Sequence, residues 1–125
     1  MAWALKYVPD KETVVVTADG HLSEAEAREL TSQAAALLKR THATRVLGDC
    51  RGMESGPSLA ALYWLVHDYA NLGWTKSPRI ALVQPEMPQA SEAAHFYATV
   101  CVNRRYQAEL FPSKEAAEAW LASGN

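Results

Sequence analysis

The sequence predicts an α/β domain in which helices cover a five-stranded mixed sheet. The spacing of apolar residues changes repeatedly between two, which is typical of strands, and 3.6, which is typical of helices. The runs at 44–48 and 79–83 show no polar alternation, as expected for parallel central strands covered on both faces. A length of 125 residues suits one domain, and no linker or repeat divides it. We therefore expect a single domain over residues 1–125.

The first two strands are expected to form an antiparallel hairpin. Trp3, Leu5 and Tyr7 occupy alternate positions, which is the pattern of a half-buried strand. A β-branched run follows at 13–17, and the proline-containing segment 9–11 between the two strands favours a turn. The short connection makes the two strands neighbours in the sheet.

The first helix is expected to begin at a capping box formed by Ser23 and Glu26. One face of this helix then carries apolar side chains at helical spacing: Ala27, Leu30, Ala34, Leu37 and Leu38. The basic pair at 39–40 closes it, where positive charge suits a helix carboxyl end. A third strand at about 44–48 and a second helix at about 58–72 follow.

The remainder of the chain continues the alternation of strands and helices. After the fourth strand at 79–83 we expect a third helix at about 89–104, with Ala93, Phe96, Tyr97 and Val100 directed inward. A fifth strand at about 106–111 leads to a last helix capped by Ser113, whose packing face is Ala116, Ala117, Trp120 and Leu121. The order is ββαβαβαβα, and right-handed crossovers place the helices against the sheet.

The carboxyl end of the third strand is the candidate binding edge. Asp49, Cys50 and Arg51 follow the apolar strand and open a polar loop over 50–57, and Ser58 then begins the second helix. In open α/β sheets, the loop after a central strand and the first turn of the next helix form the usual ligand-binding edge. We therefore take these four residues as candidate interaction residues.

The second helix is apolar on nearly every side. Only His67, Asp68 and Asn71 are expected to face water, and a helix of this kind is buried on more than one side. One side would pack on the sheet. The other side would bear some of Tyr63, Trp64, Val66 and Tyr69, and would meet a second copy of the chain, a protein partner or an apolar ligand. Self-association is the commonest of these, so we expect a homodimer. Alternatively, the first and third helices cover part of that surface.

Four segments of the chain resemble the STAS or SpoIIAA-like family, which includes anti-sigma-factor antagonists and many bacterial domains of unknown role. They are Gly20-His21-Leu22-Ser23, Arg45-Val46-Leu47-Gly48-Asp49, Arg79-Ile80-Ala81-Leu82-Val83 and the ending from Glu109 to Leu121. The resemblance implies a mixed α/β fold. It also implies a regulatory module that acts by protein–protein interaction rather than catalysis.

In the antagonists of this family, an Asp-Ser-Ser-Gly-Leu signature opens the helix after the third strand, and its first serine is phosphorylated. Residues 57–61 of this chain read Pro-Ser-Leu-Ala-Ala, so one serine remains at Ser58 while the acidic residue and the glycine are missing. The resemblance therefore makes Ser58 a candidate phosphorylation site. Its alternative role is that of a helix cap, for which serine is a preferred residue.

Two other functions remain open at this point. A small-molecule or lipid-binding domain would use the same edge, and an enclosed apolar pocket beside the second helix would favour it, whereas a flat exposed patch would favour a protein partner. An enzyme would use Cys50 as a nucleophile after a central strand. A phosphatase-like loop needs an arginine six positions after its cysteine, and position 56 is glycine. A depressed pKa of the Cys50 thiol is the observation that would favour the enzyme.

Composition and spacing argue against several other classes of protein. The formal charge is −2, from 12 basic and 14 acidic residues, which gives no general attraction to nucleic acid. The four histidines at positions 21, 42, 67 and 95 are scattered, and no phosphate-binding glycine loop occurs, so we predict no metal and no cofactor. Cys50 and Cys101 are expected to be reduced thiols. No signal peptide or membrane helix is evident, and we expect a cytoplasmic protein.

Overall fold

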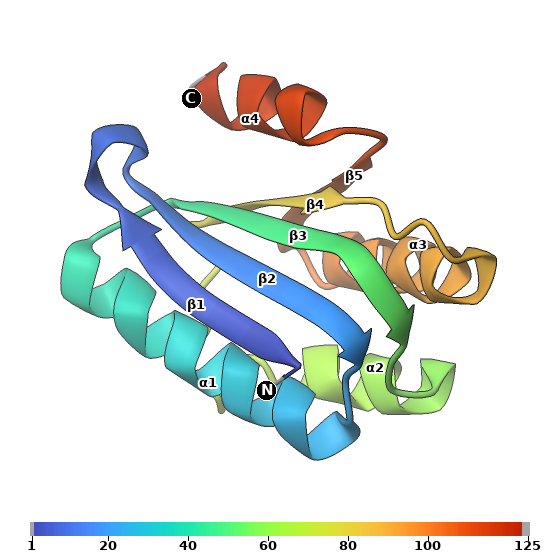
Figure 1. The fold of residues 1–125 in the computed structure, drawn as a ribbon. Coiled ribbons are helices and arrows are strands. Elements are labelled where there is room, and N and C mark those ends of the chain that lie inside the picture. Colours follow the sequence, from blue (N-terminus) through green and yellow to red (C-terminus); the bar gives the residue numbers. More distant parts are fainter. Residues whose placement is uncertain (1, 124–125) are drawn as a thin grey trace.

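The computed structural model describes residues 2–123 and shows a mixed α/β fold (Figure 1). Met1, Gly124 and Asn125, which the single-domain prediction includes, lie outside the described residues. The strands and helices alternate in the predicted order, with these bounds: β1 (Trp3–Val8), β2 (Thr13–His21), α1 (Glu24–Thr41), β3 (Arg45–Ser55), α2 (Leu59–His67), β4 (Arg79–Val83), α3 (Pro88–Asn103), β5 (Gln107–Phe111) and α4 (Lys114–Ala122).

The sheet contains five strands in the order β1-β2-β3-β4-β5. β1 runs antiparallel to β2, and each later pair is parallel, so the predicted mixed sheet and its opening hairpin are confirmed. Val46, the second residue of β3, lies between Val14 of β2 and Ile80 of β4. All three side chains are at most 3% exposed, and on the opposite face Leu47 of β3 and Ala81 of β4 are at most 2% exposed. Both faces are therefore covered here, which explains why β3 and β4 carry no polar alternation at these positions.

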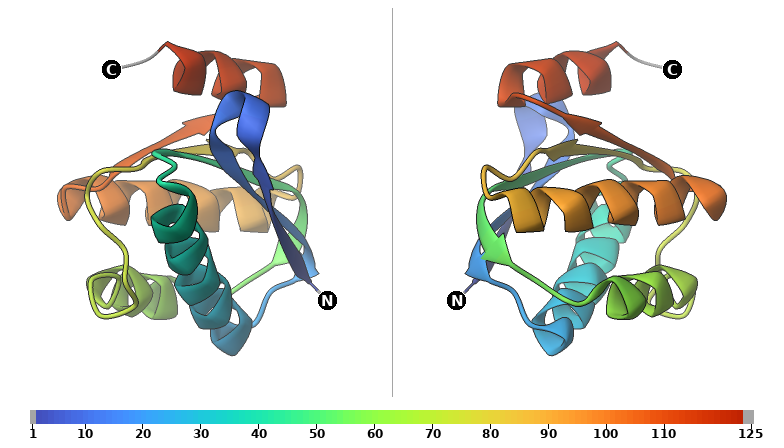
Figure 2. Two further views of the ribbon diagram at one scale, coloured as in Figure 1. Left: turned by 90° about the vertical axis from the view of Figure 1, so that its left-hand side faces the viewer. Right: turned by 90° about the vertical axis from the view of Figure 1, so that its right-hand side faces the viewer.

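Helices cover both faces of the sheet unequally. α4 lies alone on one face, where Ala117 and Leu121 pack against Leu47, Ala81 and Val83. α1, α2 and α3 lie on the other face and enclose the larger core. Figure 2 shows α2 farther from the sheet than α3, against which it packs. α2 is therefore an outer layer above the sheet.

Two helix starts follow from their capping residues. The Ser23 hydroxyl accepts a hydrogen bond from the Glu26 amide at 3.1 Å, and the Glu26 carboxylate accepts one from the Ser23 amide at 3.0 Å. The predicted capping box is therefore present at α1. Ser113 caps α4 in the same manner, accepting from the Ala116 amide at 3.1 Å. Both caps satisfy amides that a helix leaves unpaired at its amino end.

β3 is longer than predicted. The segment assigned to a polar loop over 50–57 continues as strand to Ser55. The cause is β2, which also continues to His21 and pairs with Gly52, Met53 and Ser55. Gly52 leaves room for the Asp19 side chain, whose carboxylate oxygen lies 2.1 Å from the place that a Cβ at position 52 would take.

α2 is shorter than predicted, ending at His67 instead of Leu72. Asp68 caps its carboxyl end, and the following turns lead to Gly73, which has a φ of +97°. A side chain rarely adopts this conformation, so glycine suits the point where the chain leaves the helix. α3 begins at Pro88, where the missing amide hydrogen of proline costs no helical hydrogen bond.

Candidate functional site

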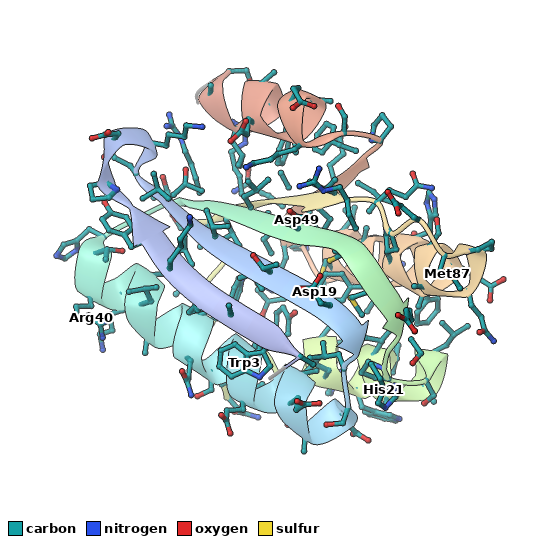
Figure 3. All side chains as sticks on the ribbon, in the orientation of Figure 1. Trp3, Asp19, His21, Arg40, Asp49 and Met87 are labelled. Atoms are coloured by element: carbon teal, nitrogen blue, oxygen red, sulfur yellow. The ribbon has the colours of Figure 1, made fainter. Side chains whose placement is uncertain are left out.

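The candidate edge on β3 divides between the two faces of the sheet. Asp49, which is labelled in Figure 3, lies on the face covered by α4, where it lines the same surface hollow as Lys114. Cys50 lies on the opposite face, beside Gly48, under the larger layer of helices. The segment was expected to be a loop with one common surface, but a strand directs successive side chains to opposite faces. Asp49 and Cys50 therefore do not form one site.

Asp49 and Arg51 form a two-contact ion pair on the α4 side. The Arg51 Nε donates to Asp49 Oδ1 at 2.9 Å, and a terminal guanidinium nitrogen donates to Oδ2 at 2.7 Å. These hydrogen bonds hold the pKa of Asp49 below its ordinary value. Arg51 already has a partner, so this pair would bind an anion only if the arginine left the carboxylate.

Cys50 does not have the properties of a nucleophile. Burial, with a smaller contribution from the Asp49 carboxylate, raises the pKa of the Cys50 thiol from 9.0 to about 12. Nucleophilic cysteines show the opposite shift, because the thiolate is the reactive form. Burial also raises the pKa of Cys101 to about 12, and both cysteines are free. The thiol chemistry therefore gives no support to the enzyme alternative.

Ser58 is exposed and caps α2. Its hydroxyl accepts a hydrogen bond from the Ala61 amide at 3.1 Å, so its role as a helix cap is established by geometry. Because the side chain faces solvent, this position is also accessible to a modifying enzyme. Phosphorylation of Ser58 remains a prediction.

α2 has an apolar inner face and an aromatic outer face. Leu62, Leu65 and Val66 are at most 8% exposed. On the outer side, the exposed large apolar side chains are Leu59, Tyr63 and Trp64, at 41%, 39% and 57%. We call these three residues the α2 outer face. Val66, one of the candidates for this surface, therefore lies in the core instead.

The α2 outer face is held in place by its neighbours. The Tyr63 and Trp64 rings meet edge to face, with centroids 5.1 Å apart, and the His67 ring stacks near Tyr63. Arg104, at the end of α3, donates to the Tyr63 hydroxyl at 3.4 Å. The basic side chain at the end of α3 thus contacts the α2 outer face.

Tyr69 lies inside the protein, although it was predicted among the surface interaction residues. Because α2 ends at His67, the following turn carries Tyr69 back toward the core, where it is 3% exposed. Its ring packs near Trp74 and Tyr106, and its hydroxyl is hydrogen-bonded to that of Tyr97. Burial raises the pKa of the Tyr69 and Tyr97 hydroxyls above their ordinary values.

An ion pair that sequence reasoning did not identify fixes the end of α2. Arg28 of α1 donates to the Asp68 carboxylate at 2.9 Å. Asp68 was expected only to face water. No local pattern indicates this contact, because the two residues lie 40 positions apart.

A cavity of about 150 Å³ lies between the sheet and α2. α1 and α3 form its sides. Its lining is apolar or aromatic apart from the Thr31 hydroxyl and the Cys50 thiol, and it includes the inner-face residues Leu62 and Leu65. The sequence predicted the elements around this space, but it could not give the distance at which α2 stands from the sheet.

Residues 2–123 contain no group of three or more histidine, cysteine, aspartate or glutamate side chains placed to hold a metal ion. None of the helices described is both long and apolar enough to cross a membrane.

Comparisons with known proteins agree on the fold. No curated protein matches the sequence. The structure of the anti-sigma factor antagonist SpoIIAA in its unphosphorylated form is similar, with a TM-score of 0.63 and 15% identity over 99% of this chain and all of that one. The phosphorylated SpoIIAA of Bacillus, described as a cell fate determinant, gives a TM-score of 0.57 and 18% identity over 95% of this chain and 99% of that one.

A third similar structure is an uncharacterized protein of the DUF3478 family from Shewanella loihica PV-4, described as having a SpoIIAA-like fold. It gives a TM-score of 0.56 and 22% identity, over 96% of this chain and 92% of that one. The sequence model of the SpoIIAA-like family matches residues 13–122, from β2 to the end of α4. Since this match spans nearly the whole chain and the fold agrees with it, the protein belongs to the SpoIIAA-like family.

Proposed function

We propose that this protein is a non-enzymatic regulatory module that acts by protein–protein interaction at the edge formed by β3 and α2. The observation that carries the proposal is the concentration of exposed apolar side chains on one helix. Five large apolar side chains are exposed among the described residues, and the α2 outer face supplies three of them, Leu59, Tyr63 and Trp64. Clustered exposed apolar residues of this kind are typical of interaction sites.

The composition of the α2 outer face also suits a protein partner. Tryptophan and tyrosine are enriched among the residues that contribute most to protein–protein binding. Trp64 and Tyr63 are ordered by their mutual contact and by Arg104, so little side-chain freedom would be lost on binding. The raised pKa of Cys50 supports the non-enzymatic part of the proposal.

The first partner to test is a second copy of the chain. A two-fold dimer requires one patch that is complementary to itself, and an aromatic helix face meets that requirement. A formal charge of −2 gives little repulsion between two copies. On a tryptophan side chain of roughly 250 Å², the 57% exposed fraction of Trp64 is about 140 Å², or about 3.5 kcal/mol per copy at ~25 cal/mol/Å².

Sedimentation velocity over a range of concentrations tests this proposal. Wild type is expected to dimerise, and Trp64→Lys to weaken the dimer by at least about 100-fold, because it places two charges in the interface. Ala119→Lys, which adds the same charge on the exposed side of α4, is the matched control and should dimerise like wild type. A wild-type monomer at the highest soluble concentration would contradict self-association.

We propose further that phosphorylation of Ser58 regulates this surface. SpoIIAA has been solved in unphosphorylated and phosphorylated forms. In this chain Ser58 precedes Leu59 of the α2 outer face, so a phosphate would add about two negative charges beside apolar residues. Ser58→Glu should weaken the dimer, whereas Ser58→Ala, which loses only the cap, should not. Equal dimer affinities for both variants would contradict this role.

A further inference from the structure

The cavity beneath α2 has the chemistry of a binding site for an apolar molecule. Its lining residues contain no charged side chain and include Val16, Val46, Leu62, Leu65 and Leu82. Among its polar groups, the Thr31 hydroxyl donates to the Ala27 carbonyl at 2.8 Å, and the Tyr69 and Tyr97 hydroxyls are bonded to each other. Water in such a space would find few of the partners that a buried water needs.

The volume of the cavity sets the size of its occupant. At about 150 Å³, it matches an engineered protein cavity of roughly the same volume that stays dry and binds benzene. A carboxylate or ammonium group would lose its hydration here without gaining a counter-charge, which is strongly unfavourable. The occupant must therefore be compact, neutral and mainly apolar.

The side chains on the sheet show where this space lies along β2. Val16 lies in the middle of β2, and its neighbours on the same face, Val14 and Ala18, are 0% and 3% exposed. Val16 itself is only half-buried and lines the cavity. Leu22 and Pro57, which follow the carboxyl ends of β2 and β3, also line it. The cavity thus extends to the edge of the sheet where α/β proteins usually bind ligands.

We propose that the cavity between the sheet and α2 binds a compact, neutral, apolar small molecule with the dimensions of a single ring. The indole N–H of Trp74, a lining residue, is buried without a hydrogen-bond partner among residues 2–123, and one oxygen atom on the ligand could use it. This site goes beyond the proposed protein interaction and does not depend on it. The two sites share α2, whose Leu62 faces the cavity while Trp64 faces outward.

Toluene is a suitable probe, with benzoate as its charged counterpart of similar size. Titration of ¹⁵N-labelled wild type with toluene should give saturable amide shifts around the cavity. Val16→Phe, which fills the space, should weaken toluene binding at least about tenfold. Val15→Phe makes the same change on the α4 side of the same strand and should leave binding unchanged. Absence of saturable shifts, or equal binding by both variants, would overturn the proposal.

A second measurement needs no variant. A ligand that binds only the folded state raises the midpoint of thermal unfolding by mass action. Toluene should raise the midpoint of the wild-type protein, and benzoate at the same concentration should not. If neither compound raises it, or if benzoate raises it as much as toluene, the proposed apolar site is wrong.

Discussion

Alkylation of Cys50 is expected to be slow in the folded protein. Iodoacetamide reacts with the thiolate, and burial raises the pKa of Cys50 from 9.0 to about 12. At pH 8 a thiol with a pKa of 9.0 is ionised in about one molecule in ten, and one with a pKa of about 12 in about one in ten thousand. The thiolate population of Cys50 should therefore be roughly a thousandfold lower than that of an ordinary cysteine.

The assay is peptide mass spectrometry after timed exposure to iodoacetamide at pH 8. Protein denatured in guanidinium gives the alkylation rate of each cysteine when it is not buried. Cys101, whose pKa is also about 12, is the comparison within the folded protein. We expect both cysteines to react slowly when folded and at ordinary rates when denatured. The contrary result is that folded Cys50 reacts as fast as the denatured control, or far faster than Cys101. Burial would then not suppress the Cys50 thiolate, and a nucleophilic role would regain support.

Three further predictions concern stability and are measured by urea unfolding. Ser23→Ala should lower the free energy of unfolding by about 1 kcal/mol, because the α1 capping box loses its hydroxyl acceptor; an unchanged midpoint would contradict this. Leu65→Ala should lower the free energy of unfolding by about 2–5 kcal/mol, since this side chain is 4% exposed. A much smaller decrease would mean that Leu65 does not hold α2 against the core. Asp49→Asn should flatten the acid dependence of stability. The Arg51 hydrogen bonds lower the pKa of Asp49 in the folded protein. Their contribution to the free energy of unfolding is therefore present above the ordinary pKa of 3.8, and it is lost as the pH falls through the pKa of the folded protein. Identical acid profiles for wild type and this variant would count against the ion pair.

The element order followed from local patterns that tertiary contacts did not override. The β-branched run at 13–17 became the first part of β2, and Ser23 with Glu26 formed the capping box that begins α1. The apolar run at 79–83 became β4, with all but its first residue buried. In each case the local preference and the burial of the side chain favour the same structure.

The errors arose where long-range pairing decides the structure. Residues 50–55 contain glycine and charged side chains, which favour a loop locally, yet β2 supplies backbone partners that keep them in a strand. Tyr69 was placed on a surface because its spacing continued the helix, but the chain turns after His67. The cavity depends on how far α2 stands from the sheet, a quantity that side-chain periodicity does not contain.

We propose that the α2 outer face binds a second copy of the chain. Site-specific photo-cross-linking tests it most directly, with a benzophenone amino acid placed at Tyr63 in one protein and at Ala119 of α4 in another. We predict a cross-linked dimer from position 63 and none above background from position 119, with cross-linked peptides that map to α2 of the second copy. Equal cross-linking from both positions, or cross-linking from position 119 alone, would show that the chain does not self-associate through the α2 outer face.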